Sequence, residues 1–180
     1  LVEHYIISSG LREIIEGTAI AKDFTHIYAS SFYYNEHGEP CWPAQVINYT
    51  NKTQFLFRIE KGILDINDNA VNDHFAEGEL RVPFRNIVYI GDSATDIPCM
   101  RLVNSLGGHS VGVYDLENTA SKDTVRRMIR DERIRYYVPA NYTKGSEMDT
   151  LMHQIIDKTA AYEVLEEKHL RDRKEAVAKY

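Results

Sequence analysis

The sequence predicts an α/β fold in which a mostly parallel β-sheet is flanked by helices and carries a β-hairpin. Short apolar runs typical of strands buried on both faces alternate with segments of helical periodicity. Because strand and helix units of this kind close around a parallel sheet, their alternation indicates the architecture. The chain has 180 residues with 43% hydrophobic content, which suits a single core.

The first strand and helix are predicted around a turn of small residues. Residues 5–8 form the strand, Ser8, Ser9 and Gly10 the turn, and residues 11–15 a helix with one apolar face. A hydroxyl at such a turn, beside the unpaired amides of a helix N-terminus, is well placed to hold a phosphate oxygen. Either serine could supply that hydroxyl, and taken alone each would be interpreted as a helix N-cap.

A hairpin is predicted next, because residues 27–34 and 44–49 are strand-like and residues 35–43 are dense in turn formers. Its aromatic side chains would either contact a substrate or cover the core. Covering the core is the preferred interpretation, since aromatic residues mainly bury area. The cluster consists of Phe32, Tyr33, Tyr34 and Trp42.

Lys52 lies just ahead of a predicted helix that ends at Lys61 and Gly62. In isolation, Lys52 would be interpreted as an ordinary solvated lysine.

Residues 86–100, NIVYIGDSATDIPCM, carry the most informative pattern. An apolar strand ends at Gly91, which would let the backbone turn sharply and approach a ligand. Asp92 and Asp96 follow, and a helix begins at Ile97 with Pro98 in its first turn. Asp92 would therefore project from the carboxyl end of a strand, where open α/β sheets bind ligands. The alternative is that Asp92 merely caps the helix.

The α/β alternation continues to the end of the chain. A strand is predicted at residues 110–114, a helix at 121–132 and a strand at 136–138. We assign residues 1–145 to the α/β core and 146–180 to a helical segment that packs on the core or extends from it. The apolar stripe of that segment comprises Met148, Leu151, Met152, Ile155, Ile156 and Ala160. Residues 63–85 are predicted to be a loop with a short turn near 77–80, and a loop of that length suggests a role on the substrate side.

At these positions the chain resembles the haloacid dehalogenase-like hydrolases, and its hairpin resembles that of their phosphoserine-phosphatase-like branch. The fourth motif of that family, Gly-Asp-x-x-x-Asp after an apolar strand, matches Gly91, Asp92 and Asp96. The second and third motifs match Ser8 and Lys52 in the same order. The resemblance implies a Rossmann-like core, with Mg²⁺ bound at Asp92 and Asp96, and a phosphoryl group bound by Ser8, Ser9, Gly10 and Lys52.

The resemblance also implies a part that these residues lack. The nucleophile of the family is the first aspartate of an Asp-x-Asp motif that precedes the serine motif, and no such motif precedes Ser8. Since the chain opens with Leu1, we expect it to be the later portion of a longer protein, truncated on the N-terminal side and without the cap that selects the substrate. The lone chain is then predicted to be inactive, and to associate with the missing segment or with itself through an open strand edge.

The resemblance therefore implies a magnesium-dependent phosphatase that hydrolyses a small phosphate monoester through an aspartyl-phosphate intermediate. Two alternatives stay open: a non-catalytic domain that uses this fold to bind a partner, and another phosphotransferase of the same type.

Composition excludes several other classes. Lysine plus arginine number 21 and aspartate plus glutamate 27, so the formal charge is −6, which argues against a nucleic-acid surface. The arginines between 126 and 135 are interleaved with acids and predict a solvated face. No apolar run approaches membrane-spanning length, and no secretory signal opens the chain, so a cytoplasmic location without membrane contact is expected. Cys41 and Cys99 cannot form a disulfide framework, and neither the scattered histidines nor residues 65–69 have metal-site spacing.

Overall fold

The computed structural model describes residues 1–177, and within them it contains two three-stranded sheets. In the first, β1 pairs in parallel with β2, which forms an antiparallel hairpin with β3. In the second, β4, β5 and β6 are all parallel. The strands are β1 (Tyr5–Leu11), β2 (His26–Tyr34), β3 (Pro40–Gln45), β4 (Val88–Gly91), β5 (His109–Tyr114) and β6 (Tyr136–Pro139). The α/β class and the hairpin are thus confirmed.

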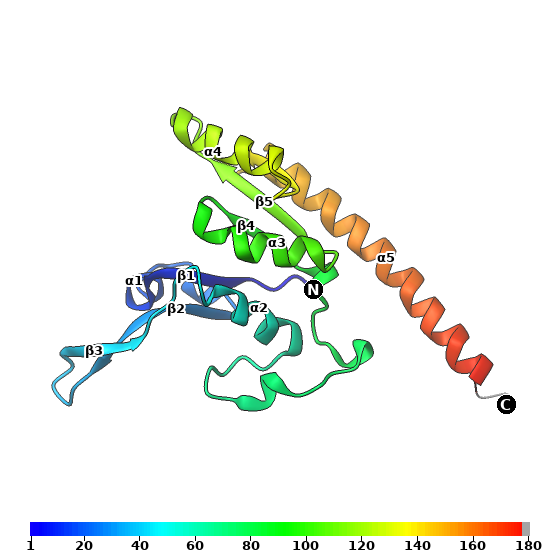
Figure 1. Ribbon diagram of the computed structural model, residues 1–180, viewed down its shortest axis with the longest axis horizontal. Coiled ribbons are helices and arrows are strands. Elements are labelled where there is room, and N and C mark those ends of the chain that lie inside the picture. Colours follow the sequence, from blue (N-terminus) through cyan, green and yellow to red (C-terminus); the bar gives the residue numbers. More distant parts are fainter. Residues whose placement is uncertain (178–180) are drawn as a thin grey trace.

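The prediction of one continuous sheet is wrong for the described part of the chain. There, β1 pairs with β2 and not with β4, and β4 pairs with β5. Figure 1 shows the first sheet lower in the view and the second above it. Apolar runs mark which segments become strands, but they do not specify which strands become neighbours.

The helices begin and end close to the predicted positions. Gly62 ends α2 in the left-handed region at φ 75°, and Pro98 lies in the first turn of α3. The fourth helix starts two residues earlier than the predicted 121. The helices are α1 (Arg12–Glu16), α2 (Lys52–Lys61), α3 (Ile97–Ser105), α4 (Thr119–Arg130) and α5 (Glu147–Val177). Residues 178–180 of the predicted last helix lie outside the described residues.

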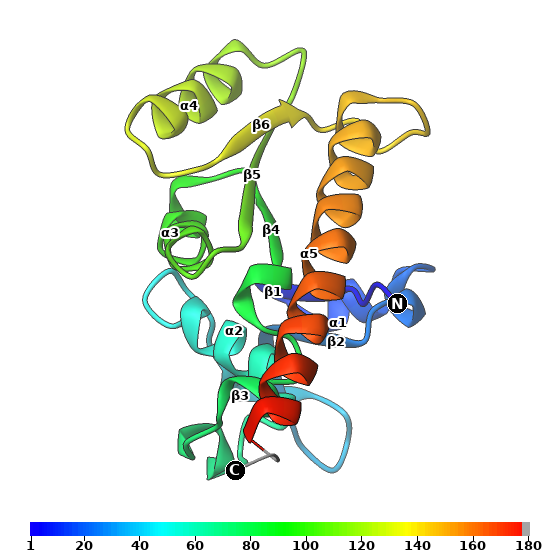
Figure 2. The same ribbon diagram turned by 90° about the vertical axis from the view of Figure 1, so that its right-hand side faces the viewer.

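The parallel sheet is covered on both faces (Figure 2). On one face, α3 and α4 pack through Cys99, Met100, Val103, Val125 and Met128. On the other face, α5 packs through a second apolar cluster. The members of that cluster are Val111, Val113, Val138, Met148 and Ile155. In the first sheet, Tyr28 packs against α2 through Phe55, with ring centroids 4.6 Å apart.

Several details differ from the predictions because they depend on distant segments. The second hairpin arm spans Pro40–Gln45 and not 44–49. No residue of α1 is buried, and Ile156 and Ala160 of α5 are exposed, so the apolar stripe of α5 reaches the core only through its first turns.

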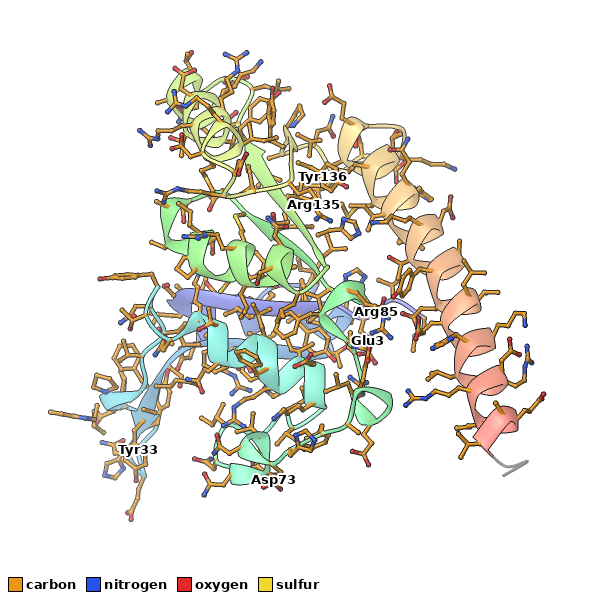
Figure 3. All side chains as sticks on the ribbon, turned by 45° about the vertical axis from the view of Figure 1, so that its right-hand side comes forward. Glu3, Tyr33, Asp73, Arg85, Arg135 and Tyr136 are labelled. Atoms are coloured by element: carbon orange, nitrogen blue, oxygen red, sulfur yellow. The ribbon has the colours of Figure 1, made fainter. Side chains whose placement is uncertain are left out.

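The aromatic cluster of the hairpin does not cover the core. Trp42 is 73% exposed and Tyr33 64% exposed, and the two are cross-strand partners. Figure 3 shows Tyr33 far out on the hairpin. The interpretation as a core cover is therefore wrong.

The loop of residues 63–85 is organised by two basic side chains of α2. The guanidinium of Arg58 donates to the carbonyl oxygens of Asp68 at 3.1 Å and Ile66 at 2.8 Å. Lys61 donates to the carbonyl of Val71 at 2.7 Å. The predicted short turn is present as a 3₁₀ helix, Glu77–Glu79. The backbone carbonyls of this loop thus bind the guanidinium of Arg58.

The surface agrees with one further prediction. The five arginines between 126 and 135 are all exposed, as expected of a solvated face. None of the helices in residues 1–177 has both the length and the apolar character that a bilayer span requires.

Candidate functional site

The centre of the candidate site is a buried ion pair between two predicted residues. Lys52 Nζ lies 2.7 Å from Asp96 Oδ1, and both side chains are buried. A turn places Lys52 at the start of α2: the Asn48 amide donates to Asn51 Oδ1 at 2.8 Å, and the Asn51 side chain donates to the Val46 carbonyl at 2.9 Å. The interpretation of Lys52 as a solvated lysine is therefore wrong.

The carboxylate of Asp96 has two further donors. The hydroxyl of Tyr89, on β4, donates to Asp96 Oδ1 at 2.9 Å, and the hydroxyl of Ser93 donates to Oδ2 at 3.1 Å. Both carboxylate oxygens are thus held, by α2, by β4 and by the turn that follows β4. A carboxylate is tolerated at such a depth where several donors and a cation surround it.

Gly91 makes room for this carboxylate. A Cβ on Gly91 would lie 2.8 Å from Asp96 Cβ, 2.8 Å from Asp96 Oδ2 and 2.8 Å from Met100 Cε. The backbone of Gly91 has no positive φ. The predicted sharp turn is therefore not the reason for glycine; the close approach of the Asp96 side chain is.

Asp92 is exposed and lies between Gly91, the last residue of β4, and the 3₁₀ turn Ala94–Asp96. Neither this turn nor α3 has a side-chain hydrogen bond at its N-cap, and the N-cap positions are Ser93 and Asp96. The alternative that Asp92 caps a helix is therefore wrong. Its carboxylate stands free of hydrogen bonds to the other described residues, at the carboxyl end of a parallel strand.

The serine turn has a different structure from the one predicted. The backbone of residues 5–11 is a single strand with an irregularity between Ser8 and Leu11, and Ser8 Oγ accepts from the Gly10 amide at 3.0 Å. Leu11 occupies the N-cap of α1 without a side-chain cap. Neither serine is an N-cap. Within the described residues, neither serine hydrogen-bonds to Lys52, Asp92 or Asp96.

Ser30 links the serine turn to the segment that leads to Lys52. Its hydroxyl donates to the Ser9 carbonyl at 3.3 Å and accepts from the Ile47 amide at 3.0 Å. The base of the hairpin therefore joins both predicted phosphate-binding segments at the carboxyl end of β1.

Electrostatic effects follow from burial. Burial, and then the neighbouring Cys99 and Asp96, raise the pKa of the Tyr89 hydroxyl far above its ordinary value, so it remains a neutral donor. Burial raises the pKa of the Cys99 thiol to about 11, partly offset by a hydrogen bond to Tyr89. Burial and then the negative charge of Asp92 raise the pKa of Tyr142, which follows β6. Tyr142 thus lies within electrostatic reach of Asp92.

The oxygen chemistry of the site fits a hard divalent cation in part. Carboxylate oxygen is the ligand that Mg²⁺ prefers, and Asp92 presents such oxygens. Among residues 1–177 no group of three or more His, Cys, Asp or Glu side chains converges as a metal site would require. The residues present could therefore supply only part of a magnesium coordination sphere.

Sequence reasoning missed Tyr89 and Tyr142. A tyrosine inside an apolar strand is a usable signal, since a buried hydroxyl needs a partner and two carboxylates, Asp92 and Asp96, follow it closely in the chain. For Tyr142 the sequence holds no such signal, because its proximity to Asp92 depends on how β6 pairs.

Comparison with known proteins gives one relative that bears on this chain. The chain is 25% identical over 161 residues to an uncharacterized protein of Borreliella burgdorferi. The aligned residues make up 82% of this chain and 55% of that protein. The chain thus spans about half the length of the relative it matches. No family model matches the chain, and no solved structure matches it.

Proposed function

We propose that these residues form the C-terminal part of a magnesium-dependent phosphatase of the haloacid dehalogenase-like type, which hydrolyses a phosphate monoester. The observation that carries the proposal is the buried Lys52–Asp96 pair, in which Asp96 follows the exposed carboxylate of Asp92 by four residues. A buried lysine and two carboxylates at the end of a parallel strand suit phosphoryl transfer better than a purely structural role.

Each candidate site residue has a role in this proposal. Lys52 uses one N–H bond for Asp96 and, within the described residues, has no other acceptor, so its remaining donors are free for phosphoryl oxygens. The Ser8 hydroxyl would bind the same group through its hydrogen, since its oxygen already accepts from the Gly10 amide. Asp92 would hold Mg²⁺, whose charge offsets that of the phosphoryl oxygens, while Asp96 supports the site through Lys52.

The reaction needs a nucleophile that we place on an additional strand. A carboxylate oxygen of an aspartate on that strand would bond to phosphorus as the bond between phosphorus and the ester oxygen breaks, and the leaving oxygen would take a proton from solvent water. Water would then attack phosphorus, release inorganic phosphate and restore the carboxylate. Lys52, which is already desolvated and oriented, would share with the cation at Asp92 the neutralisation of charge on the transferring group.

The packing of the two sheets supports a place for such a strand. Helix α2 packs on β1 and on α3, and α3 packs on β4. Packed helices lie ~8–10 Å apart, whereas adjacent strands lie ~4.8 Å apart, so strands under neighbouring helices leave room for one more strand between them. A parallel strand between β1 and β4 would present its carboxyl end beside Lys52 and Asp92.

The test uses the complete polypeptide and a chromogenic phosphate monoester. We expect hydrolysis that requires Mg²⁺, and we expect Asp92→Asn to lower kcat by at least about 100-fold, because an amide is a poor ligand for a hard cation. The matched control is Asp115→Asn, which neutralises an exposed carboxylate just after the neighbouring strand β5.

Equal loss of activity in both variants, with equal loss of stability, would show that the acidic edge is structural. Absence of Mg²⁺-dependent hydrolysis in a folded complete polypeptide would favour a non-catalytic binding domain instead.

A further inference from the structure

Tyr89 contacts the central ion pair from the core of the parallel sheet. Its ring is 8% exposed and belongs to the main apolar cluster, and its hydroxyl donates to the same Asp96 oxygen that holds Lys52. A tyrosine in a packed core has few conformations, so its hydroxyl marks a fixed point. The hydrogen bond from this hydroxyl therefore restricts the position of Asp96 Oδ1.

A lysine and a carboxylate do not fix each other. The ammonium is a compact charge on a flexible stem and can bond to either carboxylate oxygen with similar energy. Here Ser93 engages Oδ2 at 3.1 Å and Tyr89 engages Oδ1 at 2.9 Å, so the plane of the carboxylate is set before Lys52 binds. Removing the Tyr89 hydroxyl would leave Lys52 as the sole donor to Oδ1 among the described residues.

We propose that Tyr89 is a positioning residue, which acts through Asp96 to fix the direction in which Lys52 presents its remaining N–H bonds. This inference rests on the proposed function, because those N–H bonds are the ones assigned to the phosphoryl group. Tyr89 itself stays behind Asp96 and does not touch the substrate.

The first experiment needs no catalysis. Lysine ammonium groups that are buried and hydrogen-bonded give observable nitrogen-15 signals, and Lys52 is assigned through its side-chain carbons in the 180-residue chain. We expect its ammonium hydrogens to exchange with water about tenfold faster in Tyr89→Phe, a factor that corresponds to ~1.4 kcal/mol and to one hydrogen bond to a charged group.

The matched control is Tyr28→Phe. Tyr28 is 1% exposed, and its hydroxyl donates to the Leu64 carbonyl at 3.0 Å, so this variant also removes one hydroxyl hydrogen bond from the core but leaves Asp96 untouched. We expect Lys52 exchange to stay within about twofold of the parent there. Equal acceleration in both variants, or none in Tyr89→Phe, overturns the proposal.

The second experiment is the kinetics of the complete polypeptide. Tyr89→Phe should lower kcat about tenfold and leave KM within about twofold, because misdirected N–H bonds weaken the transition state more than the ground state. Tyr28→Phe should change neither constant. Unchanged kcat in Tyr89→Phe overturns the proposal. If the complete polypeptide is inactive while Lys52 exchange still distinguishes the two variants, the proposed function fails and the positioning of Lys52 by Tyr89 stands.

Discussion

Lys52 Nζ and Asp96 Oδ1 are 2.7 Å apart, and the two side chains are only 7% and 8% exposed. The residues are 44 positions apart in the sequence, one at the start of α2 and one in the turn before α3. A charge buried this deeply is tolerated only beside a partner. The pair thus ties the half of the molecule around β1 and β2 to the half around β4 and β5.

The first prediction concerns the stability of this pair. We expect Lys52→Met to lower the free energy of unfolding by about 3–5 kcal/mol, because it leaves the Asp96 carboxylate buried without its cation. Urea unfolding followed by circular dichroism measures the change. The double variant Lys52→Met, Asp96→Leu should recover most of the loss, since it removes both charges.

The control for this prediction is the exposed pair of Lys168 and Asp172 on α5. Lys168→Ala should leave unfolding unchanged within error, because water and salt screen that pair. A double variant at Lys52 and Asp96 that is no more stable than Lys52→Met would contradict the account of an uncompensated buried charge.

The second prediction concerns Gly91. We expect Gly91→Ala to lower the free energy of unfolding by about 1–3 kcal/mol, because the added methyl would overlap the Asp96 side chain and Met100. Gly78→Ala is the matched control, since a Cβ there meets nothing within 4 Å. Urea unfolding should separate the two variants clearly. Comparable stabilities of the two variants would show that Asp96 can move aside, and the close contacts at Gly91 would then not explain why glycine stands there.

Local chemistry explains which parts of the fold could be predicted. Gly62 ends α2 and Pro98 opens α3 because of backbone preferences that each residue carries with it. The apolar run before Asp92 likewise indicates a strand without reference to other segments. These local preferences therefore predict that Lys52 lies at the start of a helix and that Asp92 directly follows a strand.

Contacts between distant segments explain the rest. Whether Lys52 is buried depends on Asp96, and whether Trp42 is exposed depends on what lies over the hairpin. Neither the burial of Lys52 nor the exposure of Trp42 can be predicted from the residues next to it in the sequence. The pairing of β1 with β2 and not with β4 is a property of the same kind. Tyr89 shows where a local signal was available, since a hydroxyl in an apolar strand calls for a partner.

The third prediction concerns pH. Burial, and then the charges of Lys158 and Arg135, lower the pKa of His109 below its ordinary value, and Lys158 Nζ lies 3.4 Å from His109 Nε2. Below pH ~6.5 the unfolded state binds a proton that the folded state refuses, so stability falls as pH falls toward the lowered pKa. We expect a slope of at most ~1.4 kcal/mol per pH unit from this group.

Urea unfolding between pH 8 and pH 5 tests this prediction. His109→Gln should flatten the fall in stability, because glutamine does not titrate. His26, whose pKa is also lowered by burial, gives a contribution of the same sign that remains in both proteins. A pH dependence that is identical in the parent and in His109→Gln would show that His109 titrates normally in the folded state.

The last prediction concerns the activity of the 180 residues alone. We expect no measurable hydrolysis of a chromogenic phosphate ester and weak magnesium binding at best, because Asp92 supplies only part of a near-octahedral oxygen shell and both oxygens of Asp96 already accept hydrogen bonds. Ser8 and Lys52 can position a phosphoryl group, but positioning cannot replace the attacking atom of covalent catalysis.

The measurement compares residues 1–180 with and without a separately made segment that bears an Asp-x-Asp strand from the complete polypeptide. Activity should appear only on mixing, and it should be lost when the first aspartate of that segment is changed to asparagine. Robust magnesium-dependent turnover by residues 1–180 alone, abolished by a substitution within them, would place the nucleophile in this chain and overturn the proposed division of the site.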